Sequence, residues 1–400
     1  MKKVLKKIHL WLSVPTGIVI TLVCFSGAML AFEKEITEAI KPELYFVKDA
    51  KGEPIPMQQL MEKVEETLPD SVSISGVTVF ADSTRTYQVS LSKPRRASIY
   101  VNQYTGEVTG RSERLPFFNT MFHLHRWLLG SSSGVGKLLT GICALALAFI
   151  LVTGILMWLT NRNKPLKASL SIHVTKGWGR FWHDLHVAGG IYATIFLLAM
   201  ALTGLTWSFS WYRNGFYACF GVESSERSGA HGEGGNSHGE GRDSHGEGRN
   251  NHEGKRGEGR GEGRGNEFYH EEGYGFHRRS PYRHWDDVLN EVALKNPGYR
   301  QITLKPEVAE VVPEGRLSMR ATDKYSYDRR SGEITDVQLY SAGKKDTKVR
   351  SGIYMVHTGS WGGIITRILN FLAALIGATL PLTGYWLWIR RLTRKRHQQA

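Results

Sequence analysis

Four histidines near the ends of four apolar segments are the residues in this chain best suited to chemistry. His9 and His186 stand at one end of the first and third segments, and His125 and His357 precede the second and fourth. A haem iron held between helices takes one neutral imidazole from each side, so ligation requires one histidine per helix at matched depth. We therefore expect one haem between His9 and His186 and a second between His125 and His357.

These histidines need helices that cross a membrane to position them. Nearly uncharged stretches cover residues 10–32, 138–160, 187–212 and 371–389, and each is close to the roughly 20 residues that span hydrocarbon. Basic residues cluster before the first stretch, between the second and third, and after the fourth. By the positive-inside rule, both termini are then cytoplasmic. The first stretch exceeds the roughly 7–15 apolar residues of a signal peptide, so we expect an uncleaved membrane anchor.

Composition and missing motifs narrow the function classes. Much of the net charge of +14 lies at the cytoplasmic flanks of the spans, so membrane topology explains it and nucleic-acid binding is not expected. The three cysteines form no CxxC pair, which argues against a thiol redox centre. No glycine-rich dinucleotide motif follows a strand, and no cytosolic segment is large enough for a nicotinamide or flavin domain. Electrons must therefore come from quinol or from a redox partner.

Two large outer segments resemble each other. The first predicts a helix at 56–68 and strands at 73–79, 86–91 and 98–101, and the second predicts a helix at 285–294 and strands at 317–321 and 324–328. Each copy ends in a hairpin signal, in which Gly106 or Gly332 would supply a positive φ angle. The expected fold is an integral membrane α-helical protein with four transmembrane helices in two repeats, each repeat carrying a periplasmic α+β module.

The expected division of the chain follows from this duplication. The parts are the N-terminus and first span (1–36), the first outer module (37–116), an outer histidine segment with the second span (117–162), a cytoplasmic loop (163–182), the third span (183–213), a glycine- and histidine-rich insert (214–279), the second outer module (280–348), and an outer histidine segment with the fourth span and basic C-terminus (349–400).

A hydroxyl residue followed by glycine recurs once in each span. The four pairs are Ser26-Gly27, Thr153-Gly154, Thr203-Gly204 and Thr383-Gly384. His9 and Gly27 are 18 residues apart, as are His186 and Gly204, which is about 27 Å along a helix. Each glycine should then lie at the depth of the other haem. Such small residues allow either a flat macrocycle or a neighbouring helix backbone to approach closely.

The order of these elements resembles the PepSY-associated transmembrane helix family. The residues that carry the resemblance are His9-Leu-Trp-Leu, His125-Arg-Trp-Leu-Leu-Gly, Leu185-His186-Val-Ala-Gly-Gly190, His357-Thr-Gly and the Thr-Gly-x-x-x-Trp endings at Thr153 to Trp158 and Thr383 to Trp388. One departure is Ser13, which stands where the third span has Gly190. The resemblance covers the chain apart from the glycine-rich insert. It implies a PepSY module, two b-type haems, and transfer of electrons to a ferric siderophore or other iron chelate in the periplasm.

Several neighbouring residues compete for roles at the haems. His123 and His183 lie close enough in sequence to be second-choice ligands or propionate contacts, but His125 and His186 each begin the longer match to the family. Lys137 and Arg367 follow the outer histidines where the spans begin. Either cation would suit a haem propionate, although snorkelling to lipid headgroups explains them equally well.

The insert is expected to be disordered because its composition offers too little apolar surface to bury. Its histidines His231, His238, His245 and His252 recur every seven residues, so loose metal capture is a hypothesis beside the simpler reading as a solvated linker. Two other function classes stay open for the whole chain. One is a haem-free membrane protein whose outer modules bind or regulate an envelope protein, and the other is a siderophore or iron transporter.

Overall fold

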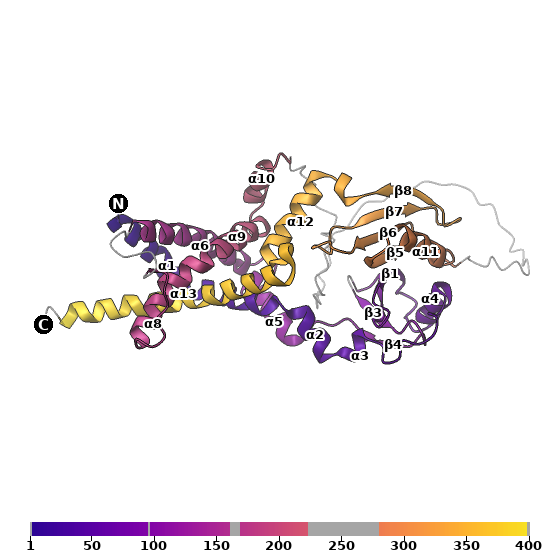
Figure 1. Cartoon of the computed structure of the whole chain (residues 1–400), viewed down its shortest axis with the longest axis horizontal. Coiled ribbons are helices and arrows are strands. Elements are labelled where there is room, and N and C mark those ends of the chain that lie inside the picture. Colours follow the sequence, from indigo (N-terminus) through magenta and orange to yellow (C-terminus); the bar gives the residue numbers. More distant parts are fainter. Residues whose placement is uncertain (1, 95–96, 161–168, 223–279, 398–400) are drawn as a thin grey trace, which may run out of the picture.

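The computed structural model describes residues 2–94, 97–160, 169–222 and 280–397. A helical bundle forms one end of the molecule and a single β-sheet forms the other (Figure 1). The start of the first helix and the end of the last both lie at the end of the bundle away from the sheet. Residues 223–279, which include the four regularly spaced histidines of the insert, lie outside the described residues, as do residues 161–168 of the expected cytoplasmic loop.

The described residues include four helices long and apolar enough to cross a membrane. They are α1 (Lys2–Leu30), α6 (Val135–Leu159), the continuous run of α8 (Trp178–Asp184), the π-helical turn η1 (Leu185–Gly189) and α9 (Gly190–Ser208), and α13 (Gly363–His397). The expected number of spans is confirmed by length and composition. Helix α13 extends beyond its apolar stretch at both ends, whereas the other three begin before their stretches and end inside them, at Leu30, Leu159 and Ser208.

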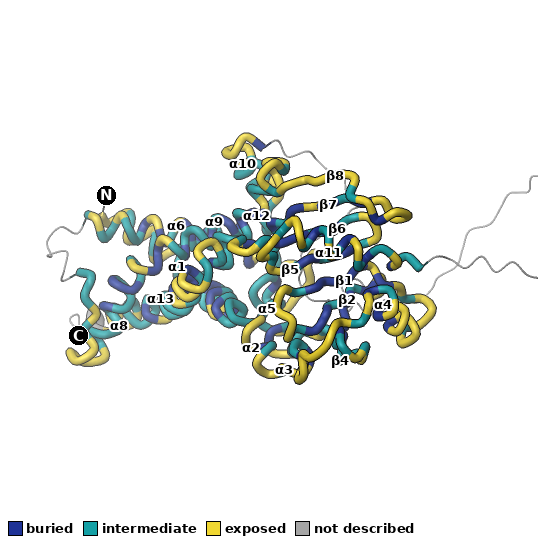
Figure 2. Tube along the Cα trace, turned by 45° about the vertical axis from the view of Figure 1, so that its right-hand side comes forward, coloured by how far each residue is buried: buried dark blue, intermediate teal, exposed yellow. Residues whose placement is uncertain are grey.

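The four long helices pack as a closed ring in which α1 contacts α6 and α13, and α9 contacts the same two helices. Ile20, Leu151 and Leu197 are buried at the centre. Large apolar side chains such as Ile18 and Ile195 are exposed on the outside. Figure 2 shows the alternation of buried and exposed turns along these helices. An apolar exterior on helices of this length is what lipid contact requires.

Shorter helices connect the bundle to the sheet. They are α2 (Glu33–Ile40), α3 (Pro42–Tyr45), α5 (Pro116–Trp127), α10 (Ser210–Ala218) and α12 (Lys345–Thr358), with 3₁₀ turns η2 (Tyr340–Ala342) and η3 (Ser360–Gly362). Helices α5 and α12 carry the outer histidines into the bundle, where they contact α1 and α9 respectively. Each is followed at once by a membrane-spanning helix.

The two outer segments form one eight-stranded antiparallel sheet with strand order β4-β3-β2-β1-β5-β6-β7-β8. The strands are β1 (Ile74–Phe80), β2 (Tyr87–Leu91), β3 (Ser98–Val101), β4 (Val108–Arg111), β5 (Tyr299–Lys305), β6 (Val308–Pro313), β7 (Asp323–Tyr327) and β8 (Ile334–Gln338). The halves join where β1 pairs with β5, with Val77 opposite Leu304. The modules are thus one continuous structure.

The second half of the sheet corrects the sequence interpretation. The expected strand at residues 317–321 is wrong, because these residues lie between β6 and β7. Strands β5 and β6 were missed, although they place Ile302, Leu304 and Val311 in the core. The large apolar residue of that segment, Leu317, is 50% exposed and does not contribute to the sheet core. The central strands are instead defined by pairing across the two halves, which no local pattern records.

The two hairpin turns are confirmed. Gly106 and Gly332 have φ angles of +77° and +79°. Their backbone N–H groups donate to the carbonyls of Asn102 and Asp328, each at 2.8 Å. Glycine is favoured at both positions because a side chain is strained at these angles.

The sheet core is covered by α4 (Met57–Glu66) and α11 (Trp285–Lys295), one helix from each half. The N-terminus of α4 has no side-chain cap of its own. Asp286 of α11 supplies one instead: its two carboxylate oxygens accept hydrogen bonds from the backbone N–H of Met57 at 3.0 and 2.8 Å. This contact ties the first half of the sheet domain to the second.

Candidate functional site

The structure brings the four histidines together as two pairs. His9 on α1 and His186 in η1 have ring centres 6.5 Å apart with an interplanar angle of 86°. His125 on α5 and His357 on α12 have ring centres 6.1 Å apart at 58°. An imidazole nitrogen binds a transition metal at about 2 Å, so two imidazoles on opposite sides of one iron have centres about 6 Å apart. Both separations fit a shared metal.

Hydrogen bonds fix the orientation of each ring. The Nδ1 atoms of His125, His186 and His357 lie 2.9, 3.1 and 3.0 Å from backbone carbonyl oxygens of Val23, Leu380 and Met200. A carbonyl only accepts, so Nδ1 carries the proton in each ring. His9 Nδ1 lies 3.0 Å from the Thr153 hydroxyl, which itself donates to a carbonyl and so accepts from the ring. In all four residues Nε2 is left with its lone pair, as a metal ligand requires.

The glycine of each hydroxyl–glycine pair faces one of these rings. The nearest atom to a Cβ built on the glycine is the Cε1 carbon of the histidine, for Gly27 with His125, Gly154 with His9, Gly204 with His357 and Gly384 with His186. The corresponding distances are 2.8, 3.6, 3.1 and 3.3 Å. Gly27 and Gly204 therefore lie at the level of His125 and His357, as their spacing from His9 and His186 predicts, and Gly154 and Gly384 lie at the level of His9 and His186. The group that contacts each of these glycines is the edge of an imidazole ring.

The same contact recurs four times with the same register. The carbonyl that binds each Nδ1, directly or through Thr153, belongs to the residue four positions before the glycine, namely Val23, Ile150, Met200 or Leu380. Because glycine has no Cβ, the imidazole ring can come close enough to reach a carbonyl one turn away on the neighbouring helix. The threonines add a second contact: Thr383 Oγ1 lies 2.9 Å from His186 Nδ1 and Thr203 Oγ1 lies 3.2 Å from His357 Nδ1.

The backbone differs between His9 and His186, which form the inner pair. His186 lies in the π-helical turn η1, a feature that often marks functional sites in helices. His9 lies within the regular helix α1. Ser13, which replaces the glycine of the third span, turns its hydroxyl onto the carbonyl of His9 at 2.6 Å. It therefore satisfies its polar group within its own helix.

The competing histidines lie elsewhere. The ring of His123 packs against Trp127 with centres 5.1 Å apart. His183 Nδ1 lies 3.2 Å from Asp184 Oδ1. Asp184 also accepts from His173 and Arg180, each at 2.8 Å, so His183 belongs to a polar cluster beside the inner pair.

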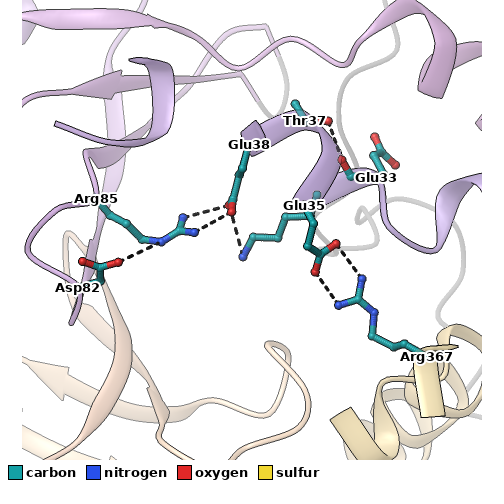
Figure 3. A network of polar contacts seen from close by, with 8 residues as sticks. Glu33, Glu35, Thr37, Glu38, Asp82, Arg85 and Arg367 are labelled. Atoms are coloured by element: carbon teal, nitrogen blue, oxygen red, sulfur yellow. Dashed lines mark hydrogen bonds and ion pairs between the residues drawn. The ribbon is translucent and has the colours of Figure 1, made fainter. Parts of the chain in front are cut away.

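Arg367 is occupied by a carboxylate of the protein. Its Nη1 and Nη2 donate to the two oxygens of Glu35 at 2.6 and 2.9 Å, and Nη2 also donates to the carbonyl of Ala31 at 2.6 Å. Figure 3 shows this pair beside the contact of Glu38 with Arg85, so that α2 links α13 to the sheet. Lys137 lies half-buried in the first turn of α6.

Two buried donors near the histidine pairs have no hydrogen-bond partner among the described residues. They are Nη1 of Arg114, which lies 11 residues before His125, and Nε1 of Trp158, which lies four residues after Gly154. Buried donors in proteins are normally satisfied. A donor of this kind can be satisfied by a bound group that carries acceptors, as haem propionates do.

Sequence reasoning identified the histidines but missed the groups that orient them. The carbonyls carry no sequence signal of their own. The recurring hydroxyl–glycine pair was the sequence feature that could have located them, because in each span the carbonyl that orients the histidine belongs to the residue four positions before the glycine. Arg114 was missed because it lies outside every span and every motif, in the segment between β4 and α5.

Comparison with known proteins agrees with this architecture. A family model described as the PepSY-associated TM region matches residues 6–391, nearly the whole chain. No curated protein matches this chain. With four membrane-type helices, one antiparallel sheet and a family match over this range, the chain belongs to the PepSY-associated transmembrane family.

Proposed function

We propose that this protein is an inner-membrane reductase that holds two b-type haems and delivers electrons to ferric iron chelates such as siderophores in the periplasm. The observation that carries the proposal is the geometry of the two histidine pairs. Each pair joins one histidine from each of the two expected repeats, at ring separations of 6.5 and 6.1 Å. Every Nδ1 is engaged, which leaves Nε2 for iron.

The two pairs occupy different levels of the bundle. His9 lies in the third turn of α1 and His125 contacts Gly27 near the other end of the same helix. When bound, haem supplies one-electron chemistry, and the protein supplies ligands, orientation and exclusion of water. Two such sites stacked along the bundle would connect a donor on the side of the termini to an acceptor on the side of the sheet.

The proposed direction of electron transfer rests on the charges that flank the spans at each end of the bundle. Basic residues flank the spans on the side of the termini, which favours a cytoplasmic location. The donor there would be quinol or a redox partner. On the other side, the sheet would hold the ferric complex near His125 and His357. Reduction favours release because hard oxygen chelators bind Fe(II) more weakly than Fe(III).

Haem quantification in single variants tests the proposal. We expect His9→Ala and His186→Ala to lose the inner haem, and His125→Ala and His357→Ala to lose the outer one. His123→Ala and His183→Ala are matched controls, since these rings contact Trp127 and Asp184, and both should keep two haems. Wild-type protein without a b-type signal in a reduced-minus-oxidised spectrum would contradict the proposal and favour a haem-free binding protein.

A further inference from the structure

Arg114 is the most unusual charged residue near the outer histidine pair. Its side chain is only 8% exposed. Its Nε and Nη2 donate to the two oxygens of Glu33 at 2.6 and 2.7 Å. The guanidinium carbon lies 4.2 Å from the ring centre of Phe122. Its Nη1 is buried and has no hydrogen-bond partner among the described residues.

This leaves part of a buried guanidinium unsatisfied. The group has five N–H donors in a rigid planar fork. Glu33 takes one edge of the fork, and Phe122 covers a face of it. A buried donor without an acceptor is unfavourable, and a carboxylate is the acceptor that the fork fits best.

The location of Arg114 relates this donor to the outer histidine pair. Phe122 lies on α5 one turn before His125. Glu33 begins α2 six residues after Gly27, the glycine against which His125 packs. Arg114 thus contacts α5, which carries His125, and α2, which follows the helix against which His125 packs. Figure 1 shows α2 and α5 at the end of the bundle next to the sheet.

We propose that Nη1 of Arg114 donates a hydrogen bond to a propionate carboxylate of the haem held by His125 and His357. This inference rests on the proposed haem binding and adds the residue that anchors the carboxylate edge of the outer haem. It assigns to Arg114 the propionate contact that the sequence suggested for Arg367, because the Nη atoms of Arg367 already contact Glu35 and Ala31.

Reconstitution with two porphyrins tests the contact. Full-length protein carrying His9→Ala, which should hold only the outer haem, is titrated with iron protoporphyrin IX and with its dimethyl ester. The ester keeps the ring and the iron but lacks both carboxylates. We expect Arg114→Gln to weaken binding of the free acid by roughly 10- to 100-fold, the usual range for a hydrogen bond to a charged group, and to leave ester binding nearly unchanged. In the His9→Ala protein that retains Arg114, the ester should bind more weakly than the free acid by a similar factor.

Two control variants separate anchoring from a structural role. Arg85→Gln breaks an equivalent two-point contact with Glu38 on the same helix α2, and it should leave acid and ester binding unchanged. Glu33→Gln removes the carboxylate partner but keeps Arg114, so acid binding should persist. If Glu33→Gln weakened acid binding as much as Arg114→Gln, or if Arg114→Gln weakened acid and ester equally, the inference would be overturned. A wild-type protein that binds no haem would overturn the proposed function as well.

Discussion

His125 fits against α1 because residue 27 is glycine. A Cβ atom at Gly27 would lie 2.8 Å from Cε1 of His125, a distance at which one of the two must move. The same ring donates from Nδ1 to the carbonyl of Val23 at 2.9 Å. The contact with glycine and the hydrogen bond therefore depend on each other. His357 and His186 repeat this relationship at Gly204 and Gly384, whereas a Cβ at Gly154 would lie 3.6 Å from His9, whose ring bonds the Thr153 hydroxyl.

We expect alanine substitution of the four glycines to act in a graded way. Gly27→Ala should displace His125 and reduce outer haem content most, since its Cβ contact would be the shortest. Gly154→Ala is the matched control, because its Cβ would lie 3.6 Å from His9, an ordinary contact. Pyridine haemochrome quantification of purified protein measures the effect. Equal haem content in both variants would contradict the proposed role of Gly27.

The threonine contacts should tune the haems without being essential for binding. Thr383→Val removes the hydroxyl 2.9 Å from His186 Nδ1 and leaves the Leu380 carbonyl in place. Loss of an acceptor on Nδ1 makes the ligand less basic, which stabilises Fe(III) less. We expect both haems to be retained and the midpoint potential of the inner one to rise by some tens of mV, where about 59 mV corresponds to a tenfold change for a one-electron couple.

Spectroelectrochemical titration of the two haems measures this shift. Ser26→Ala is the control, because the Ser26 hydroxyl donates to the carbonyls of Leu22 and Val23 within its own helix and should affect the outer haem less. A Thr383→Val protein with an unaltered inner potential would contradict the role of the hydroxyl.

The ion pair between Glu35 and Arg367 predicts an acid-sensitive contact between α2 and α13. Burial alone would raise the pKa of Glu35, but hydrogen bonds from Arg367 outweigh it and hold the pKa below its ordinary value. A lowered folded pKa means that the contact stabilises the fold above the unfolded pKa of about 4.3. This stabilisation is lost as the pH falls through the folded pKa.

Hydrogen exchange of α2 as a function of pH checks the contact. Protection in the wild type should decline below about pH 4, modestly because the Glu35 side chain is 46% exposed. Glu35→Gln should remove this part of the pH dependence, whereas substitution of the exposed Glu43 by Gln should preserve it. An unchanged acid profile in Glu35→Gln would show that the pair does not hold α2.

The cap that Asp286 provides to α4 should stabilise the sheet domain. Asp286→Ala leaves the Met57 N–H without its acceptor, so we expect a loss of about 1 kcal/mol in the free energy of unfolding, as for other helix caps. Asp286→Asn retains an accepting oxygen and should lose less. Denaturant unfolding monitored by tryptophan fluorescence measures both variants, and equal stability of Asp286→Ala and wild type would refute the role of the cap.

Much of this protein was predictable from short-range sequence. Four apolar stretches gave four membrane-type helices, since a helix satisfies its own backbone hydrogen bonds whatever surrounds it. The turns at Gly106 and Gly332 were equally local, because only nearby residues determine a positive φ angle. The helices α4 and α11 followed from their apolar periodicity.

The tertiary structure decided what lies between distant residues. It merged two outer segments into one sheet through β1 and β5, a pairing that depends on surfaces far apart in the chain. It oriented His125, His186 and His357 through backbone carbonyls, groups that every residue has and that no sequence marks. It also directed Arg367 to Glu35 and left Nη1 of Arg114 without an acceptor among the residues that the structure describes. Sequence therefore determined which side chains are available, and packing determined which of them face each other, because contacts between separate helices depend on geometry rather than on spacing.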